Sequence, residues 1–178
     1  VLAADRDKAP LDRLAADGVK AASVDEIGES CRTIFLSLPG GKEVEEVCLG
    51  ANGLVSKARL GWTVVDLSTA PPILARRLYE EFQGKASAFA DAPVARTRQA
   101  AIDGTLSIMV GATGPTFERI EPLLRHMASE VTHCGDVGAG QTVKILNNMI
   151  LFQTVVALAE GLSIARANGV DGKVLFET

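Results

Sequence analysis

The sequence predicts an α/β fold in which a doubly wound, mostly parallel sheet is followed by the start of an all-α domain. Over the first two-thirds of the 178-residue chain, short apolar runs alternate with segments of helical spacing, as in sheets whose parallel strands are joined by helices. After Gly135 only helical spacing is found. We therefore expect residues 1–137 to form the α/β domain and residues 138–178 to open the helical domain, with residues 136–140 as the hinge.

Turn and capping residues set the limits of the expected elements. Gly18 and Gly169 are suited to end helices, and Ser23 is suited to cap the start of one. The Pro-Gly-Gly run at 39–41 stops an apolar strand. The expected strands cover residues 1–4, 33–38, 63–67, 86–90, 106–110 and 130–134. The expected helices cover residues 8–17, 24–30, 43–49, 73–82, 115–127 and a long segment from the hinge to 168, with a further helix starting at 170–173.

Composition excludes several classes of function. The formal net charge is −4, lysines and arginines form no run, and the chain has one tryptophan and one tyrosine, so the charge and stacking surfaces of a nucleic-acid-binding protein are missing. The three cysteines and two histidines lack metal-ligand spacing, and we expect no metal site. Scattered cysteines suit a reducing compartment, which predicts a cytoplasmic protein.

The long apolar helix is the most unusual element of the chain. From residue 143 to 162 its apolar side chains fall on all sides, which predicts burial in a core or between domains. Because half a domain cannot cover it, we expect further helices and another subunit, in a homodimer or homotetramer, to bury it. A membrane span is not expected, since the segment also carries Lys144, Asn147, Asn148, Gln153 and Glu160.

Lys144 and Asn148 stand four residues apart on one face of this helix, with Asn147 beside them. An ammonium group in apolar surroundings is unfavourable and has a lowered pKa, which suits proton transfer. A structural role is the alternative, because lysines extend to solvent along apolar surfaces and asparagines near a helix start can bond neighbouring backbone. The segment alone leaves both interpretations open.

Polar residues also follow several of the expected strands. In open parallel sheets, ligands bind outside the carboxyl ends of the strands. Such ends carry Asp-Arg at 5–6, Leu-Pro-Gly-Gly at 38–41, Ser-Thr-Ala-Pro-Pro at 68–72 and Ala-Arg-Thr at 95–97. Turn chemistry alone accounts for the glycines and prolines but accounts poorly for Arg96.

Three motifs, in order, resemble those of the β-hydroxyacid dehydrogenase family, the 3-hydroxyisobutyrate dehydrogenase-like enzymes. Residues 66–72, Asp-Leu-Ser-Thr-Ala-Pro-Pro, are similar to the family's D-x-S-T-x-x-P loop. Asp-Ala-Pro-Val at 91–94, followed by Gly-Thr-Leu at 104–106, is similar to its substrate-loop region. The run 138–148, which ends in Asn-Asn and contains Lys144, is similar to its catalytic signature G-x-G-x-x-x-K-x-x-N-N. The similarity covers essentially the whole chain and implies a Rossmann-like fold.

Two parts of the family's pattern are missing from the sequence. The first motif, a G-x-G-x-x-G turn, has its place upstream of Val1, and the helices that close the family's substrate pocket have theirs beyond Thr178. We therefore interpret the sequence as an internal portion of a longer protein and expect it to bind cofactor poorly by itself.

The resemblance implies a nicotinamide cofactor and its contact residues. Asp5 stands where the family's second strand ends, and a carboxylate there accepts hydrogen bonds from the adenosine ribose, which favours NAD over NADP. Arg6 beside it can turn toward a phosphate, so NADP stays an alternative. Leu38 and Pro39 correspond to the loop along the cofactor, and Thr69 corresponds to a residue near the nicotinamide ribose.

The resemblance also implies a small anionic substrate. Ser68 corresponds to a residue near this substrate. Where the family has D-A-P-V-S-G-G, residues 95–97 are Ala-Arg-Thr, as in the subgroup that includes sulfolactaldehyde reductase. An arginine presents a planar fork of donors to a carboxylate, sulfonate or phosphate, so we expect Arg96 to bind the anionic end with help from Thr97. Arg98 is the alternative for this role.

Lys144 corresponds to the family's catalytic lysine. In reduction it would donate a proton, or a strong hydrogen bond, to the substrate carbonyl as hydride arrives. Asn148 would orient Lys144 and bond the substrate, and Asn147 is a second candidate for contact with the substrate. The implied activity is that of an NAD(P)-dependent dehydrogenase or reductase for a short β-hydroxy acid or its semialdehyde, of the 3-hydroxyisobutyrate, tartronate semialdehyde or sulfolactaldehyde type. Two alternatives stay open: a non-catalytic nucleotide-binding homologue, and a relative of 6-phosphogluconate dehydrogenase.

Overall fold

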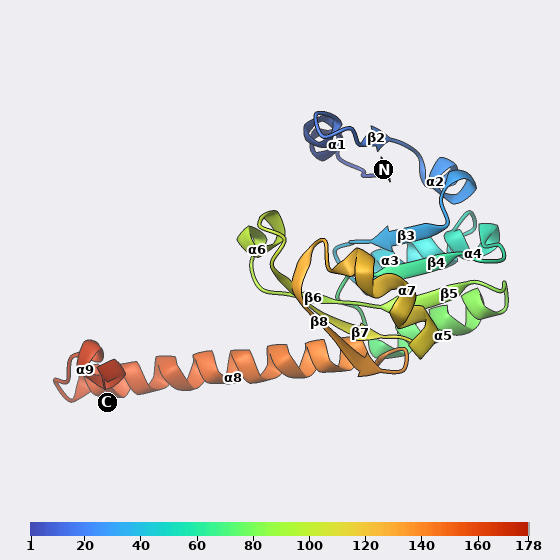
Figure 1. Ribbon diagram of the computed structural model, residues 1–178. Helices are drawn as coiled ribbons and strands as arrows, with labels where there is room; N and C mark the ends of the chain where they lie inside the picture. Colours follow the sequence, from blue (N-terminus) through green and yellow to red (C-terminus); the bar gives the residue numbers. More distant parts are fainter. Residues whose placement is uncertain (178) are drawn as a thin grey trace.

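A six-stranded sheet forms the centre of the molecule (Figure 1). The computed structural model describes residues 1–177. In spatial order the strands are β3 (Thr33–Leu36), β4 (Thr63–Asp66), β5 (Ala88–Asp91), β7 (Leu106–Gly111) and β6 (Val94–Ala95), and β8 (Ala128–Gly135) pairs with β7.

The sheet contains two groups of parallel strands, and the antiparallel pairing of β5 with β7 joins the two groups. Strands β3, β4 and β5 are parallel, in a register that places Leu36, Asp66 and Asp91 side by side at their carboxyl ends. Strand β7 runs antiparallel to β5 and β6 and parallel to β8. The pairing of Asp91 with Gly111 joins β5 to β7. The predicted α/β fold is confirmed, with this reversal as an addition.

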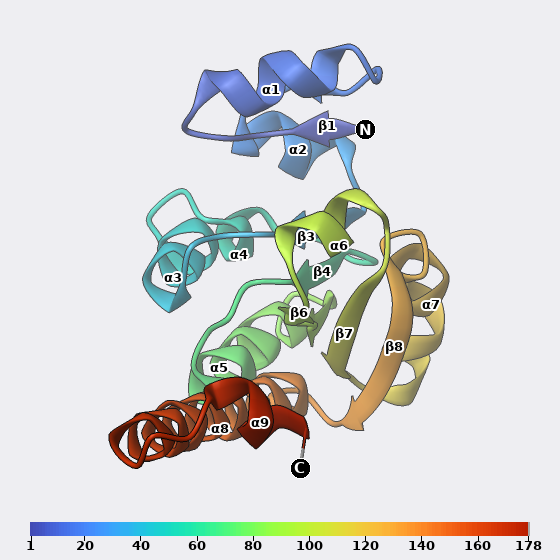
Figure 2. The same cartoon turned by 90° about the vertical axis from the view of Figure 1, so that its left-hand side faces the viewer.

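Helices cover both faces of the sheet, as expected for a doubly wound fold (Figure 2). Neighbouring residues on a strand point to opposite faces. Val64 therefore packs into one core with α3 (Gly41–Leu49) and α5 (Pro72–Gln83). Val65 packs into the other core with α7 (Gly114–Leu124).

The first residues form a small unit beside the main sheet (Figure 1). Strands β1 (Leu2–Ala3) and β2 (Lys20–Ala21) pair in parallel and are connected by α1 (Lys8–Ala15), and α2 (Val24–Ser30) leads to β3. Ser23 caps α2 in a reciprocal capping box, as predicted. Strand β2 lies outside the predicted elements because two exposed residues carry no alternation pattern.

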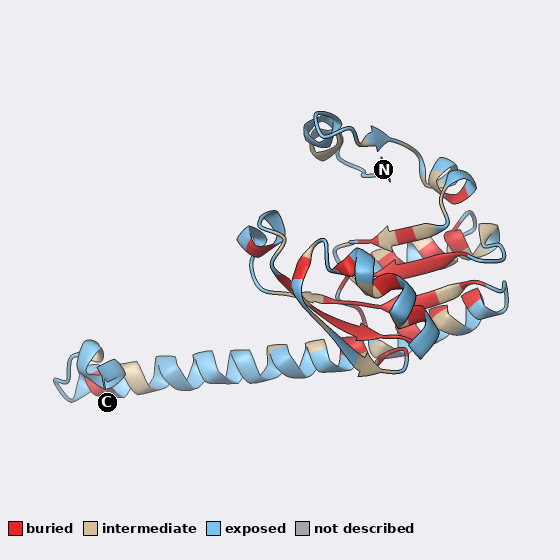
Figure 3. Cartoon of the chain, viewed as in Figure 1, coloured by how far each residue is buried: buried red, intermediate tan, exposed pale blue. Residues whose placement is uncertain are grey.

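Helix α8 (Ala139–Ala167) has 29 residues and extends away from the sheet (Figure 1). Gly169 follows it with a φ of 73°, the left-handed backbone expected of a helix stop, and α9 (Gly172–Glu177) folds against its end. Most of α8 is exposed (Figure 3). Within residues 1–177 no element covers its middle, and Ile150 is 61% and Phe152 65% exposed. Its expected burial by further helices and another subunit therefore stays a prediction.

Short elements account for the remaining differences from the prediction. Helices α4 (Leu54–Lys57) and α6 (Arg98–Ile102) and strand β6 were not predicted, because so few residues carry no periodicity. The hinge is also shorter than expected, since residues 136–138 alone separate β8 from α8.

Candidate active site

The candidate site lies at the carboxyl edge of the three parallel strands. A loop leaves the sheet after each of Leu36, Asp66 and Asp91, which the register places side by side. Helix α8 begins at the same edge, where its start contacts β5 and β7. Strand-end loops and a helix start therefore converge, as they do where open parallel sheets bind ligands.

Two of these loops are tied to each other. Leu38 N donates a hydrogen bond of 2.9 Å to Ser68 Oγ. Ser68 is 4% exposed, so its hydroxyl joins the loops from beneath, while the neighbouring Pro39 and Thr69 face solvent. The structure thus brings together four residues predicted to contact cofactor or substrate.

Asp66 supports the second loop as a buried carboxyl group, 1% exposed. Its Oδ1 accepts a hydrogen bond of 2.9 Å from Ser68 N. Burial raises the pKa of Asp66 to about 6, and the nearby negative charge of Asp91 adds to the increase. Asp66 therefore stabilises the backbone of the loop and does not reach solvent.

Asp91, fully buried at the end of β5, docks α8 onto the sheet. Its Oδ1 accepts from Gly138 N at 2.6 Å and its Oδ2 from Gln141 N at 2.7 Å. These are amides that a helix start leaves without an internal partner, and a carboxylate is stabilised by the helix dipole there. Burial raises the pKa of Asp91, against the opposing effect of these amides and of the Arg76 charge.

Gln141 makes a second connection between α8 and the sheet. Its side chain is completely buried, with Oε1 accepting from Ala70 N at 3.0 Å and Nε2 donating to Ser68 O at 2.7 Å. Both ends of the amide are therefore bonded to the loop after β4, on either side of Thr69.

Glycines permit this close approach of α8. Gly138 has a φ of 94°, in the left-handed region that favours glycine. At Gly140, a Cβ atom would collide with Met109 O and lie 2.9 Å from Asp91 O. The start of the helix can therefore lie against β5 and β7 only without a side chain at residue 140.

Lys144 and Asn148 follow Gln141 on the same face of α8. Both are half-buried, whereas Asn147 is exposed. Desolvation lowers the pKa of Lys144, as the sequence predicts. Within residues 1–177 the ammonium group forms no hydrogen bond or ion pair, so it is available to a ligand, and its predicted orientation by Asn148 involves no hydrogen bond.

Asp5 and Arg6 lie apart from this cluster, after β1. Asp5 is exposed, and its Oδ1 accepts from Asp7 N at 2.8 Å. Arg6 forms an exposed ion pair of 3.1 Å with Glu46 of α3. Beside them is an open hollow of about 350 Å³, lined also by residues 50–53. The two residues therefore sit on a surface and not in a closed pocket.

The structure does not place Arg96 beside Lys144. Arg96 stands between β6 and α6, and α6 lies away from the start of α8 in Figures 1 and 2. Its guanidinium donates to Thr105 O at 2.6 Å and to Ser129 Oγ at 2.8 Å, and forms an ion pair of 2.8 Å with Glu130. Binding of a substrate anion would require Arg96 to leave these partners.

The backbone at this loop is also unusual. Arg96 has a φ of 84°, a conformation that glycine adopts freely and that is uncommon for other residues. Thr97 caps α6, with its Oγ1 accepting from Ala100 N at 3.3 Å. The structure thus assigns Thr97 a capping role, and its predicted contact with substrate stays a prediction.

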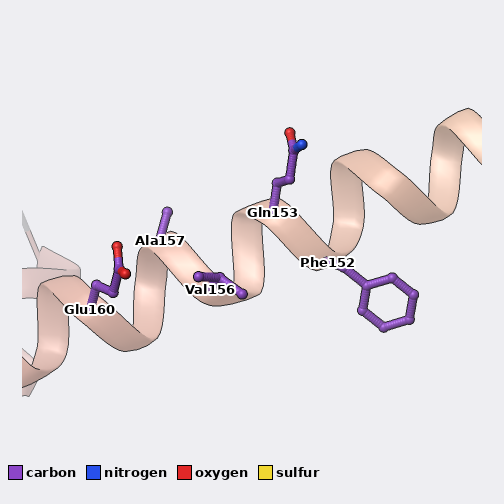
Figure 4. Close-up of a pocket in the computed structure, with 5 residues that line it drawn as sticks. All are labelled: Phe152, Gln153, Val156, Ala157 and Glu160. Carbon is purple, nitrogen blue, oxygen red and sulfur yellow. The ribbon is translucent and has the colours of Figure 1, made fainter.

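Another hollow, of about 340 Å³, lies along the middle of α8 (Figure 4). It is open to solvent and begins about two turns beyond Lys144. Its lining residues all belong to this one helix: Phe152, Gln153, Val156, Ala157 and Glu160. It is therefore not part of the site at the sheet edge.

The sequence alone assigns no role to three residues of the site: Asp66, Asp91 and Gln141. Each has a signal in the sequence, because Asp66 and Asp91 open two of the motifs and Gln141 is a polar residue on the Lys144 face of an apolar helix. The hydrogen bond between Asp91 and Gln141 joins residues 50 positions apart, which no local pattern reveals.

The fold and the site define an open α/β domain of the Rossmann type, in which loops at the carboxyl ends of parallel strands meet the start of a helix. Residues 1–135 match the family described as the NAD binding domain of 6-phosphogluconate dehydrogenase. Residues 138–178 match the family described as the NAD-binding region of NADP-dependent 3-hydroxyisobutyrate dehydrogenase. The chain belongs to the β-hydroxyacid dehydrogenase family, as its motifs predict.

Individual relatives agree with this assignment. The chain is 37% identical over 155 residues to mitochondrial 3-hydroxyisobutyrate dehydrogenase of Mus musculus, covering 87% of this chain and 46% of the relative. It is 34% identical over 178 residues to 2-(hydroxymethyl)glutarate dehydrogenase of Eubacterium barkeri, covering 99% and 59%. The structure of Mycobacterium tuberculosis 3-hydroxyisobutyrate dehydrogenase with L-serine matches with a TM-score of 0.90 at 30% identity, over 98% of this chain and 59% of that one. The chain spans about half the length of the curated relatives it matches.

Proposed function

We propose that this chain is part of an NAD(P)-dependent enzyme that interconverts a short β-hydroxy acid and its semialdehyde. The observation that carries the proposal is Lys144, a half-buried ammonium group with a lowered pKa on a helix docked to a strand-end loop. Relatives named for 3-hydroxyisobutyrate, 2-(hydroxymethyl)glutarate and 2-hydroxy-3-oxopropionate support this class of substrate.

NAD is the proposed cofactor, with NADP as the alternative. The residues present fit such a group: Pro39 and Thr69 are exposed at the sheet edge, and Asp5 presents an exposed carboxylate after β1. That carboxylate suits ribose hydroxyls, while Arg6, the residue that could bind an added phosphate, is paired with Glu46. A bound nicotinamide supplies the hydride.

Lys144 would move the proton of the reaction. In reduction, Nζ donates a proton to the carbonyl oxygen of the substrate, and in oxidation it accepts the proton of the hydroxyl group. Its positive charge stabilises the negative charge that develops on this oxygen. Asn148, half-buried one turn further along α8, offers an amide donor to the same substrate.

The substrate is proposed to carry an anionic group, as in the 3-hydroxyisobutyrate, tartronate semialdehyde and sulfolactaldehyde types. Arg96 is the proposed partner of that group, with Arg98 as its rival. Because Glu130 pairs with Arg96, the anion would have to replace this carboxylate. The loop would then carry Arg96 toward the helix that holds Lys144.

The test is the Lys144→Met variant of the full-length protein. It is assayed with the semialdehyde formed by oxidation of 3-hydroxyisobutyrate, with tartronate semialdehyde and with sulfolactaldehyde, each with NADH and NADPH. Turnover should fall by about 10²–10⁴-fold, the usual contribution of a proton donor, while cofactor affinity stays the same. Lys173→Met, which removes an exposed lysine of α9, serves as the control. Near-normal turnover of Lys144→Met would contradict the mechanism, and a wild-type protein that binds NADH but reduces nothing would be a non-catalytic homologue.

We also propose that other helices of the protein and a second subunit cover α8, in a homodimer or homotetramer. In each subunit the α/β domain would end at residue 137 and the helical domain would begin at residue 138. By length and hydropathy α8 is long and apolar enough to cross a membrane. Polar side chains interrupt its surface, however, among them Lys144, Gln153 and Glu160. The match of residues 138–178 to a dehydrogenase family further supports a protein partner over lipid.

A further inference from the structure

Three residues occupy one face of the first three turns of α8. Gln141, Lys144 and Asn148 are spaced by three and four residues, so their side chains lie within about 60° of each other around the helix. Gln141 is completely buried against the loop after β4, whereas the other two are half-buried. The direction in which Gln141 points is therefore also the direction of Lys144, toward the loop that carries Thr69.

The hydrogen bonds of Gln141 leave its helix little freedom to move. Its amide bonds Ser68 O at one end and Ala70 N at the other, at 2.7 and 3.0 Å. Its own backbone N–H donates to Asp91 Oδ2 at 2.7 Å, so side chain and backbone are held by two different strand ends. Rotation of α8 by one residue, about 100°, would break all three bonds and turn Lys144 away from the loop.

We propose that Gln141, held by Asp91, is a positioning residue that sets the place of Lys144 relative to the loop at Ser68–Ala70. The inference rests on the proposed function, in which this loop lies along the nicotinamide ribose and Lys144 serves the reacting oxygen. Gln141 itself touches neither substrate nor cofactor. It acts by keeping the proton donor and the cofactor loop in one rigid arrangement.

Filling space would not require a glutamine here. An apolar side chain of similar size would pack equally well, but it would leave Ser68 O and Ala70 N buried without partners. An amide that satisfies a donor and an acceptor of the same loop accepts one orientation only. A glutamine at this position thus fixes how α8 lies relative to the loop after β4. Two reacting groups carried by the helix and the loop need such a fixed relative position.

Two variants of the full-length protein test this role. Gln141→Glu keeps an acceptor for Ala70 N but places an oxygen against Ser68 O, and Gln141→Asn shortens the same amide by one methylene group. Both should lower kcat by about 10²-fold, the effect of misplacing a reacting group by about 1 Å, with KM for NADH changed less than twofold. The control is Ile120→Ala. Ile120 is fully buried in the core between the sheet and α7, so its truncation should lower Tm and leave kcat unchanged.

The isotope effect separates positioning from loss of stability. With NADH deuterated at the transferred position, the primary deuterium isotope effect on kcat should rise in both Gln141 variants, because the chemical step becomes slower relative to product release. It should stay at the wild-type value in Ile120→Ala. Unchanged kcat and an unchanged isotope effect in folded Gln141→Asn would overturn the proposal.

A measurement independent of activity distinguishes this inference from the proposed function. Reductive methylation with formaldehyde, followed by mass spectrometry, reports the accessibility of Lys144 relative to the exposed Lys173. In the Gln141 variants, Lys144 should become labelled at a rate closer to that of Lys173. If the wild-type protein reduced no substrate, the proposed function would fail, and a changed labelling rate would still support the positioning of Lys144. An unchanged rate would overturn it.

Discussion

Asp66 shows what burial does to a single carboxyl group at this edge of the sheet. Its pKa rises from 3.8 to about 6 in the folded protein, so between these values the folded state retains a proton that the unfolded state has released. The free energy of unfolding therefore decreases as pH rises through this window. The full loss above pH 6 is about 3 kcal/mol, from 1.36 kcal/mol for each pH unit.

The Asp66→Asn variant should escape this loss. Asparagine is neutral at every pH and can still accept the hydrogen bond that Ser68 N donates. We expect its unfolding free energy to match that of the wild type near pH 4 and to exceed it by up to about 3 kcal/mol above pH 6. Urea titrations followed by circular dichroism between these pH values measure the difference, and parallel curves for the two proteins would contradict the expectation.

Arg96, the proposed partner of the substrate anion, allows substrate binding and stability to be tested separately. The change Arg96→Gly relieves a left-handed backbone that costs a non-glycine residue about 1–3 kcal/mol. It also removes an exposed ion pair with Glu130, worth about 0–1 kcal/mol, and hydrogen bonds to Thr105 O and Ser129 Oγ, worth about 0.5–1.5 kcal/mol each. The gain and the losses are similar in size, so the unfolding free energy of the variant should stay close to that of the wild type. KM for the anionic substrate should nevertheless rise at least about tenfold, the usual range for a lost charge-assisted hydrogen bond.

The rival arginine provides the comparison for that measurement. Arg98 is exposed at the first position of α6, so Arg98→Ala should leave KM unchanged if Arg96 binds the anion. The opposite result, a raised KM for Arg98→Ala with no change for Arg96→Gly, would move the anion site to Arg98.

At the scale of the elements, the packing of the start of α8 against the sheet requires a glycine at residue 140. Gly140→Ala adds a Cβ atom that collides with Met109 O and approaches Asp91 O to 2.9 Å, and backbone cannot yield there without moving the helix. We expect a loss of about 1–3 kcal/mol in unfolding free energy, as for other overpacked sites. Because a displaced α8 carries Lys144 with it, turnover should fall as well.

Gly161 supplies the control on the same helix. The nearest atom to an added Cβ there is Leu175 Cδ2 at 3.9 Å, an ordinary contact. Gly161→Ala should therefore stabilise α8 by up to about 1 kcal/mol through helix propensity alone. Thermal unfolding of the two variants measures the contrast, and an equal effect of both would show that propensity, not close packing, governs residue 140.

The elements with long periodic patterns are the ones that the sequence predicts. The helix limits near Ser23 and Gly169 are confirmed because capping chemistry depends on local residues. Short elements such as β2 and α6 carry too few residues for a period, and their structure depends on distant partners. The same division holds at the candidate site: the sequence indicates Lys144, but the bond between Asp91 and Gln141 exists only once β5 and α8 are side by side.

As a whole, the molecule combines a well-packed sheet with a helix that lacks a core of its own. Both faces of the sheet are covered by helices, and its apolar side chains are buried in two clusters. Helix α8 instead leaves large apolar side chains exposed over successive turns, among them Ile150, Leu151, Phe152 and Val156 at 53–65% exposure. A surface of this kind is typical of an interface between protein chains.

Charge placed on this surface should therefore control assembly. In Phe152→Glu a carboxylate replaces an exposed ring, 65% exposed, in the middle of α8, so burial of this face in an interface would carry an unpaired charge into an apolar contact. We expect the variant to dissociate into smaller species, by a loss of about 2 kcal/mol or more at each copy of the interface. Light scattering coupled to size-exclusion chromatography measures the mass.

Gln153→Glu, which places the same charge on the next residue of the helix, is the matched control for position and solubility. An unchanged mass for Phe152→Glu would show that this face of α8 is not the contact between subunits.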